Sequence, residues 1–441
     1  MKFSTFTLGC KVNQFETGAI ENILISHGHE HLKAGDGCDV CIINTCTVTA
    51  TSAGKSRKAI RQLKQLEPNA LIAVCGCLSQ LEPESIVSMG VDIVGGSGDR
   101  HEFVKLLELY FDEKQRDLFP LVALDEPNRR KIYEDLPCGF AKNTGKRTTQ
   151  SRTRALLKIQ DGCNNYCTYC IIPYARGHSR SLPLSKIGEQ ARYLKNLGYR
   201  EIVITGIEIS SYGEDLTGST ALIDALYEVD KAAPDVRIRL GSLDPGKITG
   251  GFISGISAIK NLCDHYHLSV QSGCDETLHR MGRKYSASGM LDAIYALRAT
   301  FPNCGITTDL LVGLPGESDE EFEKTLHFIK KAAFSDMHVF PYSARPQTKA
   351  AKMPNQVPGS VKKSRARLAS RIALEMSLNF KRSQIGRTVD VLFERKRNGL
   401  WNGYSTNYIE VSVKSEARNL RNCVKQVKIM AVEDGKVVGR V

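Results

Sequence analysis

The sequence predicts an α/β protein in three parts: an N-terminal domain around a parallel sheet, a partial β/α barrel of six units, and a small all-β barrel at the C-terminal end. Apolar runs alternate with helix-like stretches from residue 2 to about residue 111, and the same alternation returns from residue 155 to 342. Short runs rich in Val, Ile, Thr and Gly then follow Arg387, with strands predicted around residues 389–394, 408–413 and 424–431. Alternating strands and helices imply parallel sheets, whereas a series of short strands implies an all-β barrel.

The N-terminal domain is expected over residues 1–113. Its strands are predicted at residues 2–8, 39–44, 70–74 and 91–94, and its helices at 15–27, 52–66 and 101–111. In open α/β sheets, ligands bind beyond the carboxyl ends of the strands. We therefore expect a site of this domain to lie at that edge.

Three cysteines follow the first three strands at this edge, namely Cys10, Cys46 and Cys77. Three converging thiols predict an iron–sulfur cluster site with three protein ligands. Cys75 is an alternative to Cys77 as the third ligand, because alternate residues of a strand share a face and both side chains could point the same way. Gly76 frees the backbone to turn, and Cys77 lies further beyond the strand, so Cys77 is the predicted ligand. Inert buried thiols are the alternative, but chance would not place three of them at the same end.

Prolines and mixed charges interrupt the pattern over residues 112–150, which indicates an inter-domain linker. The barrel domain is expected over residues 149–376. Its strands are predicted at residues 155–160, 201–205, 236–241, 266–271, 305–312 and 337–342, and its helices at 184–196, 221–232, 248–262, 288–299 and 319–333. Six βα units without the last two predict a barrel open on one side, with its chemistry at the C-terminal mouth of the strands.

The loop after the first barrel strand carries Cys163, Cys167 and Cys170 at a CxxxCxxC spacing. A zinc ribbon pairs CxxC with a second pair of ligands, which is missing here. Three thiolates hold three irons of a [4Fe–4S] cube and leave the fourth iron open to a small molecule with an amine and a carboxylate. Three inert cysteines are disfavoured, because such residues have no reason to share a Gly-led, Asn-rich loop at a chelating spacing.

Other loops are expected at the same mouth. Residues 205–208, 269–273 and 313–317 each follow a predicted barrel strand. The last of these contains a glycine-proline turn, which lets the backbone approach a ligand closely. Each loop alone is typical of an ordinary turn, but together they favour a binding site.

The composition favours a soluble cytoplasmic protein. The start of the chain lacks the basic and apolar pattern of a signal peptide, and no apolar run approaches the length of a membrane span. In that compartment the 14 cysteines of the chain serve metals or catalysis rather than disulfides.

The net charge of +12 is concentrated in the last hundred residues. From Tyr342 to the end there are 21 Lys and Arg residues against 7 Asp and Glu. This asymmetry indicates nucleic-acid binding, with a solubilising basic face as the alternative. The aromatic residues of the tail suit stacking on RNA bases, although a core role is equally compatible with each: Phe393, Trp401, Tyr404 and Tyr408.

These motifs resemble those of the radical S-adenosylmethionine (SAM) methylthiotransferases over nearly the whole chain. The resemblance is carried by residues 7–13, 44–48, 75–80, 160–177, 271–274 and 313–317. It implies SAM and two [4Fe–4S] clusters, one held by Cys10, Cys46 and Cys77 and the other by Cys163, Cys167 and Cys170. It also implies that Tyr169, Gly313, Pro315 and Gly316 help bind SAM, and that residues 378–441 form a TRAM domain that binds tRNA. No further catalytic side chain is assigned.

The implied reaction inserts sulfur and a methyl group at an unreactive C–H bond. One SAM methylates a sulfur at the N-terminal cluster, and a second supplies the radical that activates adenine C2. Residues 205–208, 242–245 and 340–345 resemble most the branch acting on threonylcarbamoyl-adenosine beside the anticodon, although Glu208 stands where that branch has histidine. Isopentenyladenosine of tRNA and a ribosomal-protein aspartate are the alternative substrates. A reductase or flavodoxin-type electron donor and a sulfur donor are the other expected partners.

A threonylcarbamoyl substrate carries a carboxylate, and a buried unpaired carboxylate is costly. Arg176, His178, Arg180 and Arg345 follow predicted strands and are candidates to neutralise it, with local acids or tRNA phosphate as alternative partners. Two further readings remain: a radical enzyme whose N-terminal cluster only relays electrons, and a non-enzymatic RNA-binding iron–sulfur sensor. A relay cluster held only by cysteine needs a fourth thiolate, and three converge here.

Overall fold

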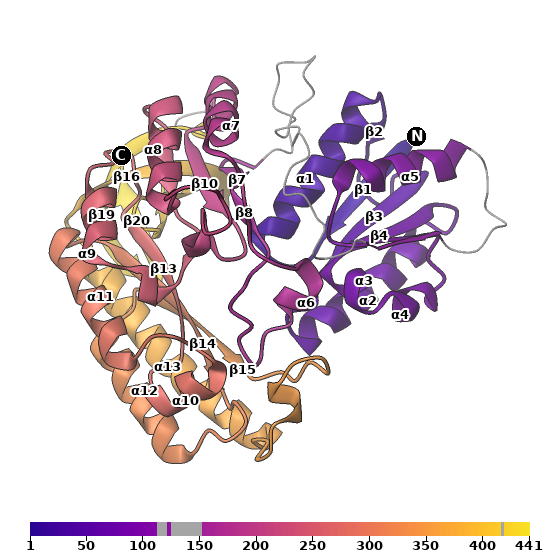
Figure 1. Cartoon of the computed structure of the whole chain (residues 1–441). Coiled ribbons are helices and arrows are strands. Elements are labelled where there is room, and N and C mark those ends of the chain that lie inside the picture. Colours follow the sequence, from indigo (N-terminus) through magenta and orange to yellow (C-terminus); the bar gives the residue numbers. More distant parts are fainter. Residues whose placement is uncertain (113–120, 125–151, 416–418) are drawn as a thin grey trace.

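The computed structural model describes residues 1–112, 121–124, 152–415 and 419–441. The N-terminal domain lies beside the barrel domain, and the C-terminal barrel packs against the barrel domain (Figure 1). Most of the predicted linker lies outside the described residues, as do the predicted domain boundaries at residues 113 and 149. No helix among the described residues has both the length and the apolar character needed to cross a bilayer.

The N-terminal domain contains a six-stranded, all-parallel sheet in the order β2-β1-β3-β4-β5-β6. Its strands are β1 (Lys2–Thr7), β2 (Glu30–His31), β3 (Val40–Thr45), β4 (Leu71–Gly76), β5 (Ile93–Gly95) and β6 (Leu121–Ala123). Its helices are α1 (Lys11–Ser26), α2 (Ala50–Leu66), α3 (Cys77–Leu81), α4 (Pro83–Val87) and α5 (Arg100–Asp112). Alternate apolar residues of β3 and β4 face opposite sides, so α1 and α5 cover one face and α2, α3 and α4 the other.

The parallel α/β architecture predicted for this domain is confirmed, with four additional elements. Two of them, β2 and β6, are edge strands of two and three residues, too short to show an apolar period. The strand β6 falls inside the stretch predicted to be a linker. The short helices α3 and α4 follow β4 directly and are separated by the residue before Pro83.

The barrel domain has the six predicted strand positions. Its strands are β7 (Ala155–Lys158), β8 (Gln160–Asp161), β9 (Arg180–Ser181), β10 (Glu201–Thr205), β11 (Arg237–Arg239), β12 (Ser242–Leu243), β13 (His265–Gln271), β14 (Gly305–Val312) and β15 (Asp336–Pro341). Its helical segments are α6 (Ile172–Arg176), α7 (Leu184–Asn196), η1 (Ile209–Ser211), α8 (Leu222–Ala232), η2 (Pro245–Lys247), α9 (Gly250–Ser257), α10 (Asp275–Met281), α11 (Ala287–Thr300), α12 (Asp319–Ala332) and η3 (Ala350–Lys352). The third strand is broken at residues 240–241, so that β11 joins the sheet β11-β10-β7 and β12 joins the sheet β12-β13-β14-β15.

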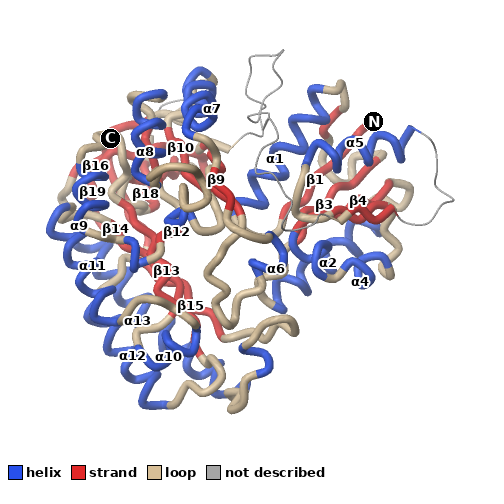
Figure 2. The backbone as a smooth tube through the Cα atoms, in the orientation of Figure 1, coloured by secondary structure: helices blue, strands red, loops and turns tan. Residues whose placement is uncertain are grey.

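The two faces of the barrel wall differ in character. Alternate residues of β13 and β14, such as Leu268 and Leu310, belong to the large core that also contains Ile294 of α11 and Ile329 of α12. Figure 2 shows these helices along the outer side of the strands and loops on the side of the N-terminal domain. The intervening residues therefore line the concave inner face of the partial barrel.

The long helix α13 (Gly359–Ser383) packs into the core of the barrel domain through Ala369, Ile372 and Ala373, and after it the chain forms a closed barrel of order β16-β17-β18-β20-β19. Its strands are β16 (Thr388–Arg397), β17 (Leu400–Ser405), β18 (Glu410–Val413), β19 (Val424–Glu433) and β20 (Lys436–Arg440). The all-β barrel is confirmed, but the sequence indicated strands only near β16, β18 and β19. Gly403 and Gly439 interrupt the β-branched pattern in the two strands that were missed.

The base-stacking interpretation of the tail aromatics is wrong for two of them, because Phe393 and Trp401 are buried in the core of the closed barrel. Tyr408 stacks on Tyr404 at a centroid distance of 4.9 Å and on His265 of the barrel domain at 4.5 Å. The stacked tyrosines therefore join the two barrels rather than presenting open faces to RNA.

Candidate active site

The loop that carries Cys163, Cys167 and Cys170 follows β8 and precedes α6, at the predicted mouth of the barrel. Its start depends on Gly162, whose φ is +70° and whose Cβ, if present, would lie 1.9 Å from the carbonyl oxygen of His178. The Cys163 amide donates to the Gly177 carbonyl at 3.1 Å. A side chain at residue 162 would force apart the two ends of the loop.

The middle of this loop is tied to two distant segments of the chain. The Thr168 amide donates to the Met281 carbonyl at 2.9 Å, and the Thr168 carbonyl accepts from the Ala350 amide at 2.8 Å. The Tyr169 hydroxyl accepts a hydrogen bond of 2.7 Å from Arg283. The loop is therefore held rigidly at positions between its cysteines.

The second set of cysteines lies at the carboxyl edge of the N-terminal sheet. Cys10 caps α1, Cys46 directly follows β3, and Cys77 begins α3 directly after β4. A Cβ on Gly9 would lie 3.2 Å from the Cys46 sulfur, which shows how closely the first two loops approach. Asn13 joins the same loops, because its amide donates to the carbonyl oxygens of Leu8 and Thr45 at 2.9 Å each.

Cys75 and Cys77 have different surroundings. Cys75 lies inside β4 and is fully buried in the apolar core between the sheet and α1. Gly76 has a φ of +105°, and the chain turns there, so that Cys77 lies beyond the strand. Burial raises the pKa of Cys77 to about 12, and the nearby Cys10 and Cys46 thiols act in the same direction.

The cysteines of the barrel loop have a similar environment. Burial raises the pKa of Cys163 to about 12 and that of Cys170 to about 11. Among the described residues, no three His, Cys, Asp or Glu side chains lie close enough to share a single metal ion. Three thiolates are the donor set that holds three irons of a [4Fe–4S] cube, and each of the two sets supplies three thiols.

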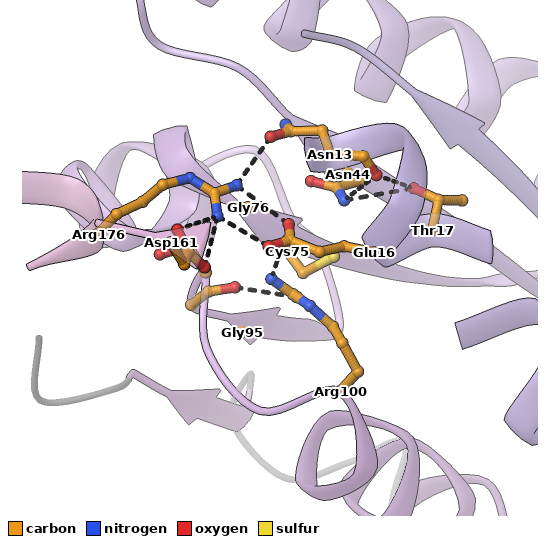
Figure 3. Close-up of polar contacts among 12 residues, drawn as sticks. Asn13, Glu16, Thr17, Asn44, Cys75, Gly76, Gly95, Arg100, Asp161 and Arg176 are labelled. Atoms are coloured by element: carbon orange, nitrogen blue, oxygen red, sulfur yellow. Dashed lines mark hydrogen bonds and ion pairs between the residues drawn. The ribbon is translucent and has the colours of Figure 1, made fainter. Parts of the chain in front are cut away.

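A buried polar network joins the two cysteine-bearing regions (Figure 3). Arg176, at the end of α6, is fully buried and donates to Glu16 of α1 at 2.7 and 3.0 Å. The same guanidinium donates to Asp161 at 3.1 Å and to Asn13 at 2.9 Å. Lys158 also contacts both acids, at 3.0 Å from Glu16 and 2.6 Å from Asp161.

Cations surround both carboxylates of this network. Burial would raise the pKa of Glu16, but Arg176, Lys158 and Arg100 outweigh it and hold that pKa at about 2. Asp161 immediately precedes the loop of Cys163, Cys167 and Cys170, whereas Asn13 contacts the loops of Cys10 and Cys46. Arg176 therefore fixes the position of one set of cysteines relative to the other.

The structure changes the interpretation of the cations expected to bind a substrate carboxylate. Arg176 is used by the network above, and the buried Arg345 donates to Thr47 at 2.6 Å and to Glu82 at 2.8 Å. Arg180 donates to the carbonyl oxygens of Arg176 and His178 at 3.0 and 2.9 Å. His178 is exposed and contacts Asn164 at 3.1 Å. The two buried arginines bind the N-terminal domain rather than facing an open pocket.

Glu208 lies in the loop after β10 and is buried. Its side chain accepts from the Ser210 amide at 3.2 Å, and its own amide donates to Gln160 at 2.9 Å. Burial, reinforced by Asp244, raises the pKa of Glu208 to about 7 although Arg283 opposes the shift. A carboxyl group with such a pKa changes its charge near neutral pH, which is typical of functional sites.

The predicted glycine-proline turn is packed against the chain itself. A Cβ on Gly313 would lie 2.2 Å from Cγ of Lys362, and one on Gly316 would lie 3.4 Å from Nε of Arg280. Pro315 is buried. The role of these residues and of Tyr169 in SAM binding stays a prediction.

A basic cavity of about 770 Å³ lies where the three domains meet. One carboxylate, that of Glu394, lines it together with six cationic side chains: Lys11, Arg152, Arg154, Arg395, Lys396 and Arg421. Such a lining attracts polyanions. The excess of basic residues in the sequence lies in the tail. Three of the six cations that line the cavity, however, belong to the other two domains: Lys11, Arg152 and Arg154.

Comparison with known proteins agrees with this geometry. Residues 157–329 match the radical SAM superfamily, and residues 2–96 match the uncharacterized protein family UPF0004. The chain is 38% identical over 431 residues to the threonylcarbamoyladenosine tRNA methylthiotransferase MtaB of Bacillus subtilis, covering 96% of this chain and 92% of that one. It is 31% identical to the tRNA-2-methylthio-N(6)-dimethylallyladenosine synthase of Pelotomaculum thermopropionicum, covering 90% and 87%.

A solved structure shares the fold. The radical SAM methyltransferase TsrM of Kitasatospora setae, with cobalamin and a [4Fe–4S] cluster bound, superposes with a TM-score of 0.56 at 14% identity, covering 91% of this chain and 77% of that one. At this identity the likeness concerns the architecture alone.

Proposed function

The chain belongs to the radical SAM methylthiotransferases that modify tRNA, and from this premise we infer that it methylthiolates C2 of N6-threonylcarbamoyladenosine next to the anticodon. As a member of that family it is a transferase that uses SAM and two [4Fe–4S] clusters. The observation that carries the inference is that the buried Arg176 holds two sets of three cysteines in fixed positions relative to each other. Methylthiolation needs a radical source and a sulfur source at one substrate atom.

The residues that would hold the cofactors follow from this geometry. Cys163, Cys167 and Cys170 would bind the cluster that, with SAM, supplies a radical for C–H activation. The second cluster, which would carry the sulfur to be transferred, would be bound by the three thiols at the N-terminal sheet edge, namely Cys10, Cys46 and Cys77. The donors fit because all six are free thiols on loops anchored by backbone hydrogen bonds.

Other side chains of the site hold neighbouring segments in position. Arg283 contacts Tyr169 at 2.7 Å and Asp244 at 3.8 Å, so it fixes the radical-cluster loop against the loop after β12. Burial and Asp244 raise the pKa of Glu208 to about 7 against the opposing effect of Arg283, so its carboxyl carries a proton in part of the molecules at pH 7. A buried carboxyl that is neutral in this way does not repel a substrate carboxylate.

The substrate assignment is supported by sequence identity. The chain is 38% identical to the relative named for threonylcarbamoyladenosine and 31% identical to the dimethylallyladenosine synthase. The alternative substrate in tRNA is isopentenyladenosine. The basic three-domain cavity supports RNA over a ribosomal-protein aspartate. A reductase or flavodoxin-type electron donor and a sulfur donor complete the proposed partners.

The deciding experiment offers the reconstituted enzyme two tRNAs, one carrying threonylcarbamoyladenosine and one carrying isopentenyladenosine. Nucleoside mass spectrometry then measures the methylthio product of each. We expect product on the first tRNA. Product on the isopentenyl form alone would overturn the substrate assignment and leave the reaction class intact.

A further inference from the structure

A row of polar side chains crosses the concave face of the partial barrel. Asp309 of β14 lies 3.5 Å from Nε2 of His267 on β13 and 3.5 Å from Nδ1 of His338 on β15. His267 is fixed in turn by Thr307, whose hydroxyl is 2.9 Å from Nδ1. Asp309 and His338 are direct register partners. We call His267, Asp309 and His338 the His–Asp–His row.

Packing does not explain this row. Barrel interiors are usually filled by bulky branched side chains, and none of the three residues belongs to a hydrophobic core. The side chain of His338 is 72% exposed, although it stands on the inner face of the wall. The row therefore presents polar groups to an open space inside the barrel.

Phe340 extends the row toward the mouth of the barrel. It is the next inward-facing residue of β15 after His338, and 41% of its surface is exposed. The two rings meet edge to face at a centroid distance of 6.2 Å. An exposed aromatic face beside hydrogen-bonding groups suits a flat heterocycle such as a nucleobase.

The position of Phe340 relates it to both sets of cysteines. Its register partner Leu311 packs against the same small apolar cluster as Tyr169 of the radical-cluster loop. Three residues beyond it, the Ser343 hydroxyl accepts from the Ala50 amide at 2.9 Å, and Arg345 then reaches Thr47 in the segment that follows Cys46. Phe340 thus lies on the strand that connects the two cluster regions.

We propose that Phe340 and the His–Asp–His row form the subsite for the adenine ring of the substrate nucleoside. Phe340 stacks on the base after it leaves the anticodon loop, and His338 donates from Nε2 to an acceptor of the base or of its N6 substituent. The hydrogen bond to Asp309 raises the pKa of His338, which keeps the donating proton on that ring. This subsite rests on the proposed function, because it takes a tRNA adenosine to be the substrate.

Binding can be tested without turnover, using full-length protein and an anticodon stem-loop that carries 2-aminopurine at the target position. The fluorescence of that base reports stacking, and anisotropy of an end label reports total binding. We expect Phe340→Leu to lose the stacking signal at saturation and to weaken binding about 5- to 100-fold. Phe340→Tyr should restore both. Phe6→Leu is the matched control, since Phe6 of β1 is 43% exposed but lies outside the barrel.

The row is tested by kinetics on both modified tRNAs. His338→Leu should raise the KM for tRNA about tenfold, whereas His338→Gln, which keeps a donor, should restore much of it. The subsite proposal is overturned if Phe340→Leu binds the stem-loop as tightly as wild type with unchanged 2-aminopurine fluorescence. An unchanged KM for tRNA in His338→Leu overturns it as well. If only the isopentenyl tRNA is a substrate and the same variants impair it, the threonylcarbamoyl assignment fails and the subsite stands.

Discussion

Single residues decide which thiols lie beyond the strand ends. Gly76 turns the chain at a φ of +105°, so Cys75 stays in the core while Cys77 moves beyond the strand. Gly162 does the same for the barrel loop, since a Cβ there would overlap the His178 carbonyl. The spacing of the cysteines in the sequence places them near strand ends. The turns at Gly76 and Gly162 then set the positions of Cys77 and Cys163.

The first prediction concerns these thiols. Cys77→Ala should roughly halve the iron bound after reconstitution, because two thiolates hold a cube poorly and the second site is independent. Cys75→Ala is the control and should leave iron near the wild-type amount, at some cost in stability from the core cavity. Iron assay with Mössbauer spectroscopy measures both. The opposite pattern would reassign the ligand to Cys75.

The second prediction concerns Arg176. Arg176→Met removes one partner of a buried ionic network and should cost about 3–5 kcal/mol of unfolding free energy. Arg176→Lys keeps the charge but loses the forked contacts to Glu16 and Asp161. It should retain iron at both sites and form deoxyadenosine, yet yield less methylthiolated tRNA per deoxyadenosine.

The ratio of the two products is the decisive readout for Arg176, because general loss of stability lowers both together. Arg57→Lys is a matched control, since Arg57 pairs with Glu82 near the surface. An unchanged ratio in Arg176→Lys would contradict a positioning role.

At the scale of elements, the join between β10 and the C-terminal barrel depends on one carboxylate. Glu201 accepts from Arg239 at 2.6 Å and also pairs with Arg237. Arg239 then donates to the carbonyl oxygens of Ser405 and Thr406 at 3.0 and 2.9 Å. The strand β17 and the turn after it are therefore held by arginines that Glu201 orients.

The third prediction is a pH dependence of this join. Burial would raise the pKa of Glu201, but Arg239 and Arg237 lower it to about 2. A depressed pKa contributes stability that is full above the ordinary pKa of 4.5 and is lost as the pH falls toward 2. Its contribution at neutral pH is on the order of 3 kcal/mol.

Glu201→Gln should therefore lower the melting temperature at pH 7 and shrink the difference from wild type as the pH falls below 4.5. Calorimetry between pH 7 and pH 3 measures both proteins. Glu189→Gln, on the exposed surface of α7, provides the control. If the difference in melting temperature between wild type and Glu201→Gln stays constant down to pH 3, the Glu201 carboxylate is not the source of the pH-dependent stability.

For the whole molecule, charge and domain arrangement act together. The closed barrel seals the base of the partial barrel through Tyr408, while its outer cations help line the basic cavity shared by three domains. Deleting the tail would expose the base of the partial barrel as well as remove cations. Point substitutions therefore test RNA contact more cleanly than truncation before Thr388.

The fourth prediction uses Lys396, an exposed cation of that cavity. Lys396→Gln should weaken tRNA binding and reduce the slope of log K against log salt by about 0.7–0.9, the loss of one phosphate contact. SAM cleavage without tRNA should not change. Lys260→Gln, on the barrel surface away from the cavity, is the control, and an identical slope in both variants would exclude the contact.

Local patterns in the sequence predicted the fold class, the six barrel strands and the six cysteines that follow strand ends. Those features depend on local periodicity and on the rule that parallel strands share a carboxyl edge, so they are readable within short windows. The same windows missed β17 and β20, where glycines interrupt the pattern, and β2 and β6, which are too short to show one.

The contacts of the charged and aromatic residues depend on the tertiary structure. Arg176 meets Glu16 across 160 residues and Arg345 meets Thr47 across 298, and no local pattern encodes a partner so distant. The core position of Trp401 and the alignment of His338 with Asp309 depend likewise on how strands pair in space. A residue's type sets what it can bind, whereas the packing of remote segments selects the partner and leaves other groups, such as Phe340, open.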